Sequence, residues 1–136
     1  MRYLAIDYGL KRTGLAVCDA RETIASPLKV IVGQRNLVEQ IEQIVASENI
    51  EGVVLGLPLN MDGSQGPQAR KVLAFANRLK ERLGIPIYLQ DERLSSFGAE
   101  EKLQTTRLSR AKRRERLDAL AAAEILQAFL DERRQG

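Results

Sequence analysis

The sequence predicts an α/β fold in which one mixed sheet of five strands is flanked by helices. At the N-terminus, three short strand-like segments follow one another with only turns between them, which is typical of antiparallel pairing. After them, segments with helical periodicity alternate with short apolar strands, and a strand–helix–strand connection implies parallel pairing. Three antiparallel strands followed by two parallel ones are therefore expected. A length of 136 residues fits one domain covering residues 1–136.

The N-terminal part is expected to form three strands that are separated by turns. Buried strands are expected at residues 2–6 and 13–17, with a turn at Gly9 between them. A third strand is expected over residues 24–32. Pro27 breaks or offsets this strand because proline has no N–H to donate to a sheet.

Helical spacing begins after the third strand. Apolar residues from position 37 to 45 recur at intervals of four, three and one, and Asn36 and Glu39 stand where an N-cap and its capping-box partner belong. Gly84 and Pro86 end a second amphipathic helix. The remaining elements are expected at residues 53–55 (strand), 72–83 (helix), 85–89 (strand), 99–103 (helix) and 114–132 (helix).

Composition limits the chemistry that this chain can perform. It has no histidine and a single cysteine, Cys18, which excludes His-based nucleophile systems, His- or Cys-cluster metal sites and an intramolecular disulfide. Any catalysis must use carboxylates, lysines or hydroxyls. A lone thiol suits a reducing compartment, so a cytoplasmic location is expected, and no apolar run is long enough to cross a membrane.

Basic residues are concentrated in one stretch. The net charge is only +3, but residues 107–116 contain six bases and one acid. Such a cluster is typical of a protein that binds a polyanion, although a solvated helix face would have the same composition. The candidate nucleic-acid contacts in this stretch are Arg110, Lys112, Arg113 and Arg114.

Asp7 ends the first strand and precedes a glycine-flanked turn. Gly9 and Gly14 allow a tight turn and a close backbone approach, and Lys11 and Arg12 between them are placed to face a phosphate. An ordinary hairpin with an acidic turn residue is the alternative.

Asp91, Glu92 and Arg93 end the last strand of the predicted sheet. Because parallel strands have their carboxyl ends at the same edge, these residues are expected beside Asp7, with Arg93 near the nucleic acid. The alternative is that one acid caps the next helix. Two nearby segments have open roles: residues 56–63 are either an ordinary connection or a substrate contact, and Ser95–Ser96 are better explained as a helix cap than as a phosphate contact.

Asp118 lies on an apolar face of the last predicted helix. With a period of 3.6 residues, Ala121, Ala122, Ile125 and Phe129 fall on its side. A buried carboxylate needs a partner or a metal, and alanines would let this helix approach the sheet closely. The alternative is an acid in the first turn that interacts with the helix dipole.

These acids predict a hard-metal site. Clustered carboxylates repel one another unless a cation neutralises them, and all-oxygen ligands select Mg²⁺ or Mn²⁺. Metal ions held in this way activate water and stabilise the leaving oxygen in phosphodiester cleavage. The predicted catalytic residues are Asp7, Asp91, Glu92 and Asp118, of which Asp7, Glu92 and Asp118 are the predicted metal ligands.

Four segments together resemble one protein family. They are residues 7–14 (DYGLKRTG), 56–63 (GLPLNMDG), 91–96 (DERLSS) and 118–126 (DALAAAEIL). This order resembles the bacterial YqgF family, also called RuvX, whose members are described as nucleases for precursor 16S ribosomal RNA and as Holliday-junction-resolvase-like. The resemblance implies a ribonuclease-H-like fold, a carboxylate-bound divalent metal and a role in ribosome biogenesis. It matches Asp7, the Asp91–Glu92 pair and Asp118 to the family's acidic residues.

One departure from the wider superfamily concerns the fourth strand. Many ribonuclease-H-like enzymes have an acid at its end, where this chain has Gly56, so the third acid must come from the next strand. The leading hypothesis is a metal-dependent nuclease that acts on structured RNA, at the 5′ end of precursor 16S ribosomal RNA, in contact with ribosomal particles. The alternatives are a resolvase of branched DNA and a non-catalytic ribosome-associated factor. The oligomeric state is left open.

Overall fold

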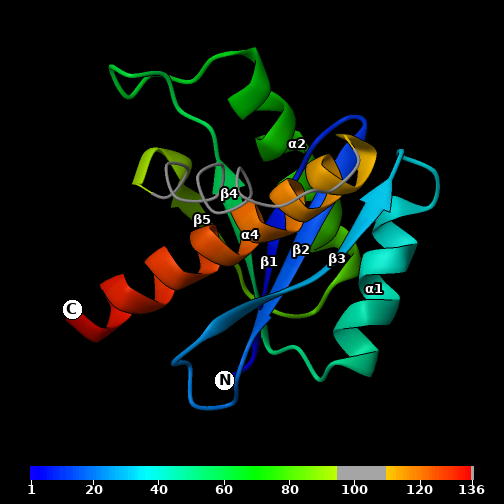
Figure 1. The fold of residues 1–136 in the computed structure, drawn as a ribbon, viewed down its shortest axis with the longest axis vertical. Helices are drawn as coiled ribbons and strands as arrows, with labels where there is room; N and C mark the ends of the chain where they lie inside the picture. The colour runs from blue at the N-terminus through cyan, green and yellow to red at the C-terminus, as the bar shows by residue number, and fades with distance from the viewer. Residues whose placement is uncertain (95–109, 136) are drawn as a thin grey trace.

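The computed structural model describes residues 1–94 and 110–135, and for residues 110–116 the backbone alone. Five strands form one sheet in the order β3-β2-β1-β4-β5, and Figure 1 shows helices on both of its faces. The strands are β1 (Tyr3–Asp7), β2 (Arg12–Cys18), β3 (Ala25–Val32), β4 (Gly52–Leu57) and β5 (Ile87–Asp91). The helices are α1 (Leu37–Ser47), α2 (Pro67–Arg82), the short 3₁₀ helix η1 (Glu92–Leu94) and α4 (Arg110–Gln135).

The strand directions confirm the predicted mixed sheet. β1 pairs antiparallel with β2, which pairs antiparallel with β3. β4 is parallel to both β1 and β5, so the carboxyl ends of these three strands meet at one edge. The β2–β3 register shifts between Leu15 and Ala16, opposite Pro27, as expected for a residue that cannot donate to the sheet.

The two faces of the sheet carry separate apolar cores. One core packs α1 and α2 against the sheet and includes Leu4, Ile6, Val53, Phe75 and Leu79. On the other face α4 crosses the strands (Figure 1). This second core is built largely from small and aromatic residues: Tyr3, Ala5, Ala16, Cys18, Val54, Ala122, Ala123, Ile125, Leu126, Phe129 and Leu130.

Alternation along the strands decides which residues face α4. Ala5 and Ala16 contribute to the α4 core. Because side chains two apart lie on the same face of a strand, Asp7 of β1 and Arg12 and Gly14 of β2 face α4 as well. The end of β1, with Asp7, and the start of β2, with Arg12, therefore both lie beneath α4.

Two local expectations need correction. Asn36 is the N-cap of α1 but adopts a left-handed conformation, φ 55°, and makes no side-chain capping bond, so the capping box with Glu39 is absent. The last helix begins at Arg110, about one turn before the expected residue 114, because the basic residues have good helix propensity. The helix expected at 99–103 lies outside the described residues.

Candidate active site

Asp7 and Glu92 meet at the carboxyl edge of the sheet. Asp7 is the last residue of β1, and Glu92 begins η1 directly after β5. Their carboxyl groups are hydrogen-bonded to each other. An acid from β5 thus reaches back across β4 to the end of β1.

Gly56 of β4 provides the space for this reach. A methyl group on Gly56 would lie 2.6 Å from Glu92 Oε1 and 2.6 Å from Cδ1 of Ile125. The Glu92 carboxyl group therefore lies directly over Gly56 of β4, where any larger side chain would meet it. The sequence shows that β4 ends in glycine, not in an acid. It does not show that Gly56 leaves the space in which the Glu92 carboxyl group lies.

The proximity of these acids changes their protonation. Burial, then the charge and hydrogen bond of Glu92, then the charge of Asp118 raise the pKa of Asp7 from 3.8 to about 8. Burial, together with the charge of Asp91, also raises the pKa of Glu92. At neutral pH the pair therefore keeps a proton, with Asp7 donating and Glu92 accepting.

Asp118 is brought to the sheet by a close contact at Gly14. A methyl group on Gly14 would lie 2.0 Å from the Asp118 carbonyl oxygen, so α4 rests directly on the backbone of β2. Asp118 lies two turns into α4, which rules out the first-turn dipole alternative. Ala122, Ile125 and Phe129 are buried as predicted, whereas Ala121 is partly exposed.

Arg12 binds Asp118 directly. Its Nε donates to Oδ2 of Asp118 at 2.9 Å, and each side chain is 29% exposed. Asp118 also acts on Asp7 through its charge. Asp118 thus lies near the Asp7–Glu92 pair. Its carboxylate, however, is bound by the guanidinium of Arg12, which the sequence predicts to contact a phosphate.

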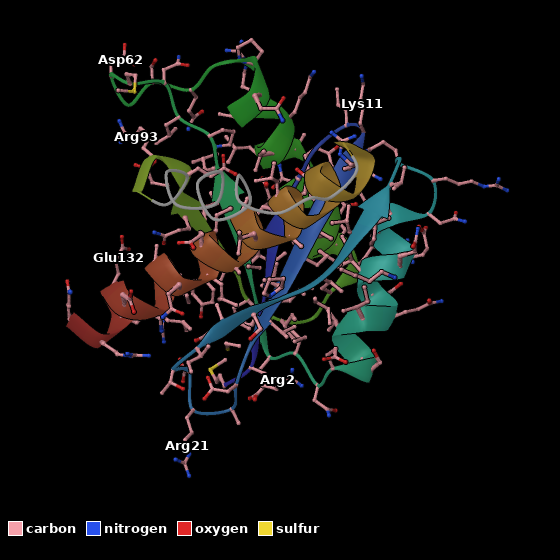
Figure 2. All side chains as sticks on the ribbon, in the orientation of Figure 1. Arg2, Lys11, Arg21, Asp62, Arg93 and Glu132 are labelled. Atoms are coloured by element: carbon pink, nitrogen blue, oxygen red, sulfur yellow. The ribbon has the colours of Figure 1, made fainter. Side chains whose placement is uncertain are left out.

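The β1–β2 turn is fixed by groups from elsewhere in the chain. Gln34 donates from Nε2 to the carbonyl oxygens of Gly9 and Leu10 at 2.8 and 3.1 Å, and it accepts from the Tyr8 hydroxyl at 2.9 Å. Lys11 is exposed on this turn, and Figure 2 shows it extending from the upper end of the molecule. The role of Gln34 is not apparent from the sequence because the contact spans 25 residues.

Asp91 is bound to Arg93. Arg93 donates from Nη2 to Oδ2 of Asp91 at 2.7 Å, and its backbone N–H donates to Oδ1 at 2.9 Å. The capping alternative therefore describes Asp91. Arg93 was predicted to contact nucleic acid, but its guanidinium also donates to the carbonyl oxygens of Asn60 and Met61 at 3.3 and 3.2 Å.

These contacts hold the β4–α2 loop next to Arg93 of η1. Figure 2 shows Arg93 beside the part of the loop that carries Asp62. Asp62 accepts from the Ser64 N–H at 2.9 Å, and Gly63 turns the chain with φ +87°. The loop presents Met61 with 93% of its surface exposed. Arg93 thus connects this loop to Asp91 at the end of β5.

Part of the predicted interface lies outside this description. Arg110, Lys112, Arg113 and Arg114 occupy the first two turns of α4, and their side chains lie outside the described part of the structure. Ser95 and Ser96 lie outside the described residues.

The donor set suits a hard cation, but the three-acid arrangement is incomplete. Asp7 and Glu92 offer carboxylate oxygens, and a cation can replace the proton they share. Among residues 1–94 and 110–135, however, no three Asp, Glu, His or Cys side chains are grouped to hold a metal ion. The carboxylate of Asp118, the remaining predicted ligand, is ion-paired with Arg12.

Substituting Gly56 by alanine is expected to displace Glu92. Either the Glu92 carboxyl group or Ile125 must move by several tenths of an ångström, because the new methyl group is within 3 Å of both. We expect the pKa of Asp7 to fall and stability to drop by about 1–3 kcal/mol through overpacking. Urea denaturation and NMR titration of the side-chain carboxyl carbons measure the two effects. An unchanged Asp7 titration would contradict this geometry.

Sequence comparison places the chain among known proteins. A relative from Desulfitobacterium hafniense is 40% identical over 135 residues, covering 99% of this chain and 95% of its own length. A relative from Sphingopyxis alaskensis is 44% identical over 132 residues, covering 96% of this chain and 86% of its own. Both are named "Putative pre-16S rRNA nuclease".

Solved structures confirm the expected ribonuclease-H-like fold. RuvC of T. thermophilus in complex with a Holliday junction substrate aligns with a TM-score of 0.63 at 17% identity, covering 98% of this chain and 96% of that one. The fowlpox virus Holliday junction resolvase aligns with a TM-score of 0.57 at 12% identity, covering 97% and 99%. The family model for RuvX, described as Holliday junction resolvase, matches residues 1–132. The chain therefore belongs to the RuvX family.

Proposed function

We propose that this protein is a divalent-metal-dependent nuclease that hydrolyses phosphodiester bonds at the 5′ end of precursor 16S ribosomal RNA. The observation that carries the proposal is the proton-sharing pair of Asp7 and Glu92 at the carboxyl edge of the sheet, with Asp118 within electrostatic reach. The name shared by the curated relatives supports the RNA substrate. Such a substrate implies a cytoplasmic protein that meets ribosomal particles. None of the described helices has the length and apolarity to cross a membrane.

Asp7, Glu92 and Asp118 are the residues that would hold Mg²⁺ or Mn²⁺. When bound, the cation supplies Lewis-acid stabilisation of the phosphoryl oxygens and lowers the pKa of a coordinated water. Glu92 is the better third acid than Asp91, because Asp91 is bound by Arg93. Lys11 and Arg12, together with the basic start of α4, would contact RNA phosphates, and Arg93 would position the β4–α2 loop.

A matched pair of variants tests the assignment of the acids. Glu92→Gln is expected to lower the rate of Mn²⁺-dependent RNA cleavage by about 10²-fold or more, the usual contribution of a catalytic acid or base. Asp91→Asn removes a neighbouring carboxylate that is ion-paired at 2.7 Å. It is expected to lower the rate by about tenfold at most, since partly exposed ion pairs contribute ~1 kcal/mol or less. The measurement is single-turnover cleavage of end-labelled precursor RNA, with EDTA as the metal-free reference. Equal losses in both variants would overturn the choice of Glu92.

A resolvase of branched DNA is the second candidate, favoured by the description of the family and by the two structural neighbours. Carboxylate-bound metal cleaves either backbone, so substrate preference depends on local contacts with the 2′-hydroxyl. Parallel assays with precursor RNA and a four-way DNA junction decide between them, and faster DNA cleavage would reverse the ranking. Salt-sensitive RNA binding without cleavage of either substrate would instead indicate a non-catalytic factor.

A further inference from the structure

We propose that Arg12 is an exchangeable counter-ion of Asp118. In the free protein its guanidinium is ion-paired with the Asp118 carboxylate, and when nucleic acid binds, the guanidinium leaves Asp118 and pairs with a phosphate instead. The inference deepens the proposed function and rests on it. It makes Arg12 a positioning residue that couples phosphate binding to completion of the acid site.

The ion pair joins two elements that are fixed independently. Arg12 begins β2, immediately after the turn held by Gln34. Asp118 is placed by the backbone contact between α4 and Gly14 on the same strand. Because both backbones are held in this way, exchange of the partner requires only side-chain movement.

Partial exposure makes the exchange possible. Both side chains are 29% exposed, and the structure gives a single Nε–Oδ2 contact at 2.9 Å between them. A two-point, parallel contact would be stronger, and guanidinium groups form such contacts readily with phosphate. Solvent screening keeps a pair of this kind weak enough to be displaced by a phosphate.

The positive charge of Arg12 lies where it opposes cation binding at the acid site. The Asp118 carboxylate already acts electrostatically on Asp7, so it lies near the acid pair while bound to Arg12. A divalent cation arriving at Asp7 and Glu92 therefore meets a guanidinium beside the third carboxylate. This positive charge repels the cation and competes with it for the same oxygen. Moving Arg12 to a phosphate removes both obstacles, so cation and nucleic acid bind with positive coupling.

The first test measures Mn²⁺ affinity without nucleic acid, by isothermal titration calorimetry. Arg12→Gln is expected to bind Mn²⁺ about tenfold more tightly than the wild type, because a nearby positive charge is lost. Arg21→Gln removes an exposed arginine at the opposite end of the molecule from Lys11 (Figure 2) and serves as the matched control, with Mn²⁺ affinity expected within about twofold because water screens its charge. The double variant Arg12→Gln/Asp118→Asn is expected to lose the gain.

The second test measures the coupling itself. Fluorescence anisotropy gives the affinity for a phosphorothioate-linked RNA hairpin with and without Mn²⁺. Mn²⁺ is expected to tighten RNA binding by the wild type several-fold more than by Arg12→Gln, because the variant has no exchange to make. Arg12→Lys keeps the charge without the guanidinium fork and is expected to fall between them, so it remains informative if Arg12→Gln folds poorly.

Three results would overturn the inference: unchanged or weaker Mn²⁺ binding by Arg12→Gln, a gain that survives Asp118→Asn, or equal Mn²⁺ enhancement of RNA binding in wild type and variant. If metal-dependent cleavage is nevertheless observed, only the counter-ion role fails. If the wild type neither binds Mn²⁺ nor cleaves, the proposed function and this inference fail together.

Discussion

Replacing Asp7 by asparagine is expected to abolish cleavage and, at the same time, to stabilise the fold at alkaline pH. The Asp7 carboxyl group is hydrogen-bonded to Glu92, and burial and the negative charge of Asp118 help to raise its pKa. Asparagine cannot lose a proton to bind a cation, so the variant lacks the central ligand of the proposed metal site, and a rate loss on the order of 10³-fold is expected, comparable with the loss of other preorganised electrostatic groups. Single-turnover cleavage in Mn²⁺ measures it, and a loss below about tenfold would show that Asp7 is not catalytic.

The stability effect follows from the raised pKa. Unfolded Asp7 has its ordinary pKa of 3.8, whereas in the folded protein the value is about 8. Between these values the folded state binds a proton that the unfolded state does not, so the contribution of Asp7 to stability is complete below about pH 4. It declines as pH rises above about 4 and is fully lost once pH has passed about 8, where the buried carboxyl group must ionise beside Glu92.

Asparagine cannot ionise, so the advantage of the variant must grow with pH. Thermal unfolding in EDTA is expected to show little difference between variant and wild type at about pH 4, near the ordinary pKa of 3.8, and a Tm several degrees higher for the variant at about pH 8.5, since ~1 kcal/mol shifts Tm by about 2–8 °C in domains of comparable size. Asp62→Asn, an exposed acid on the β4–α2 loop, controls for a general charge effect. An advantage that is equal at both pH values would contradict the raised pKa of Asp7.

Replacing Gly14 by alanine is expected to be the most destabilising single substitution discussed. The new methyl group would lie 2.0 Å from the carbonyl oxygen, 2.4 Å from the carbonyl carbon of Asp118 and 2.9 Å from the backbone nitrogen of Ala119. These are main-chain atoms of a helix, which cannot rotate aside as a side chain can. The helix must therefore move away from β2 and open the core that it covers, including Ala122 and Leu126.

We expect Gly14→Ala to lower the free energy of unfolding by about 3 kcal/mol or more, at or above the upper end of ordinary overpacking. Urea denaturation measures the loss. Gly84→Ala is the matched control, because its methyl group would meet nothing within 4 Å, and its stability is expected to stay close to that of the wild type. A Gly14→Ala protein as stable as Gly84→Ala would show that α4 does not rest on β2 in this way. Any folded Gly14→Ala protein should also lose the Arg12–Asp118 contact.

The sequence predicts the positions of Asp7 and Asp118 because local order determines where each of them lies. Asp7 ends a buried strand, and parallel pairing brings the ends of β1, β4 and β5 to one edge. The period of α4 places Asp118 on the side of Ala122 and Ile125, which the structure buries. Each inference depends on the periodicity of one element or on the direction of its neighbours.

The choice between Asp91 and Glu92 could not be made in the same way. The two acids are adjacent, and the chain leaves the strand between them and enters η1. Once strand alternation ends, the direction of a side chain depends on its partners. Asp91 turns to Arg93, and Glu92 turns over Gly56 to Asp7.

By itself, the sequence determined the mixed sheet, the helix faces and the restriction of any catalysis to carboxylates, lysines or hydroxyls, because periodicity and residue type act locally. Only the tertiary structure decided that Gly14 seats α4, that Gly56 makes room for Glu92 and that Arg12 binds Asp118. Arg12 and Asp118 are 106 residues apart, and the other two contacts also join separate elements. Such contacts depend on how closely packed backbones approach one another, to within the size of a methyl group. No pattern along the chain records that distance.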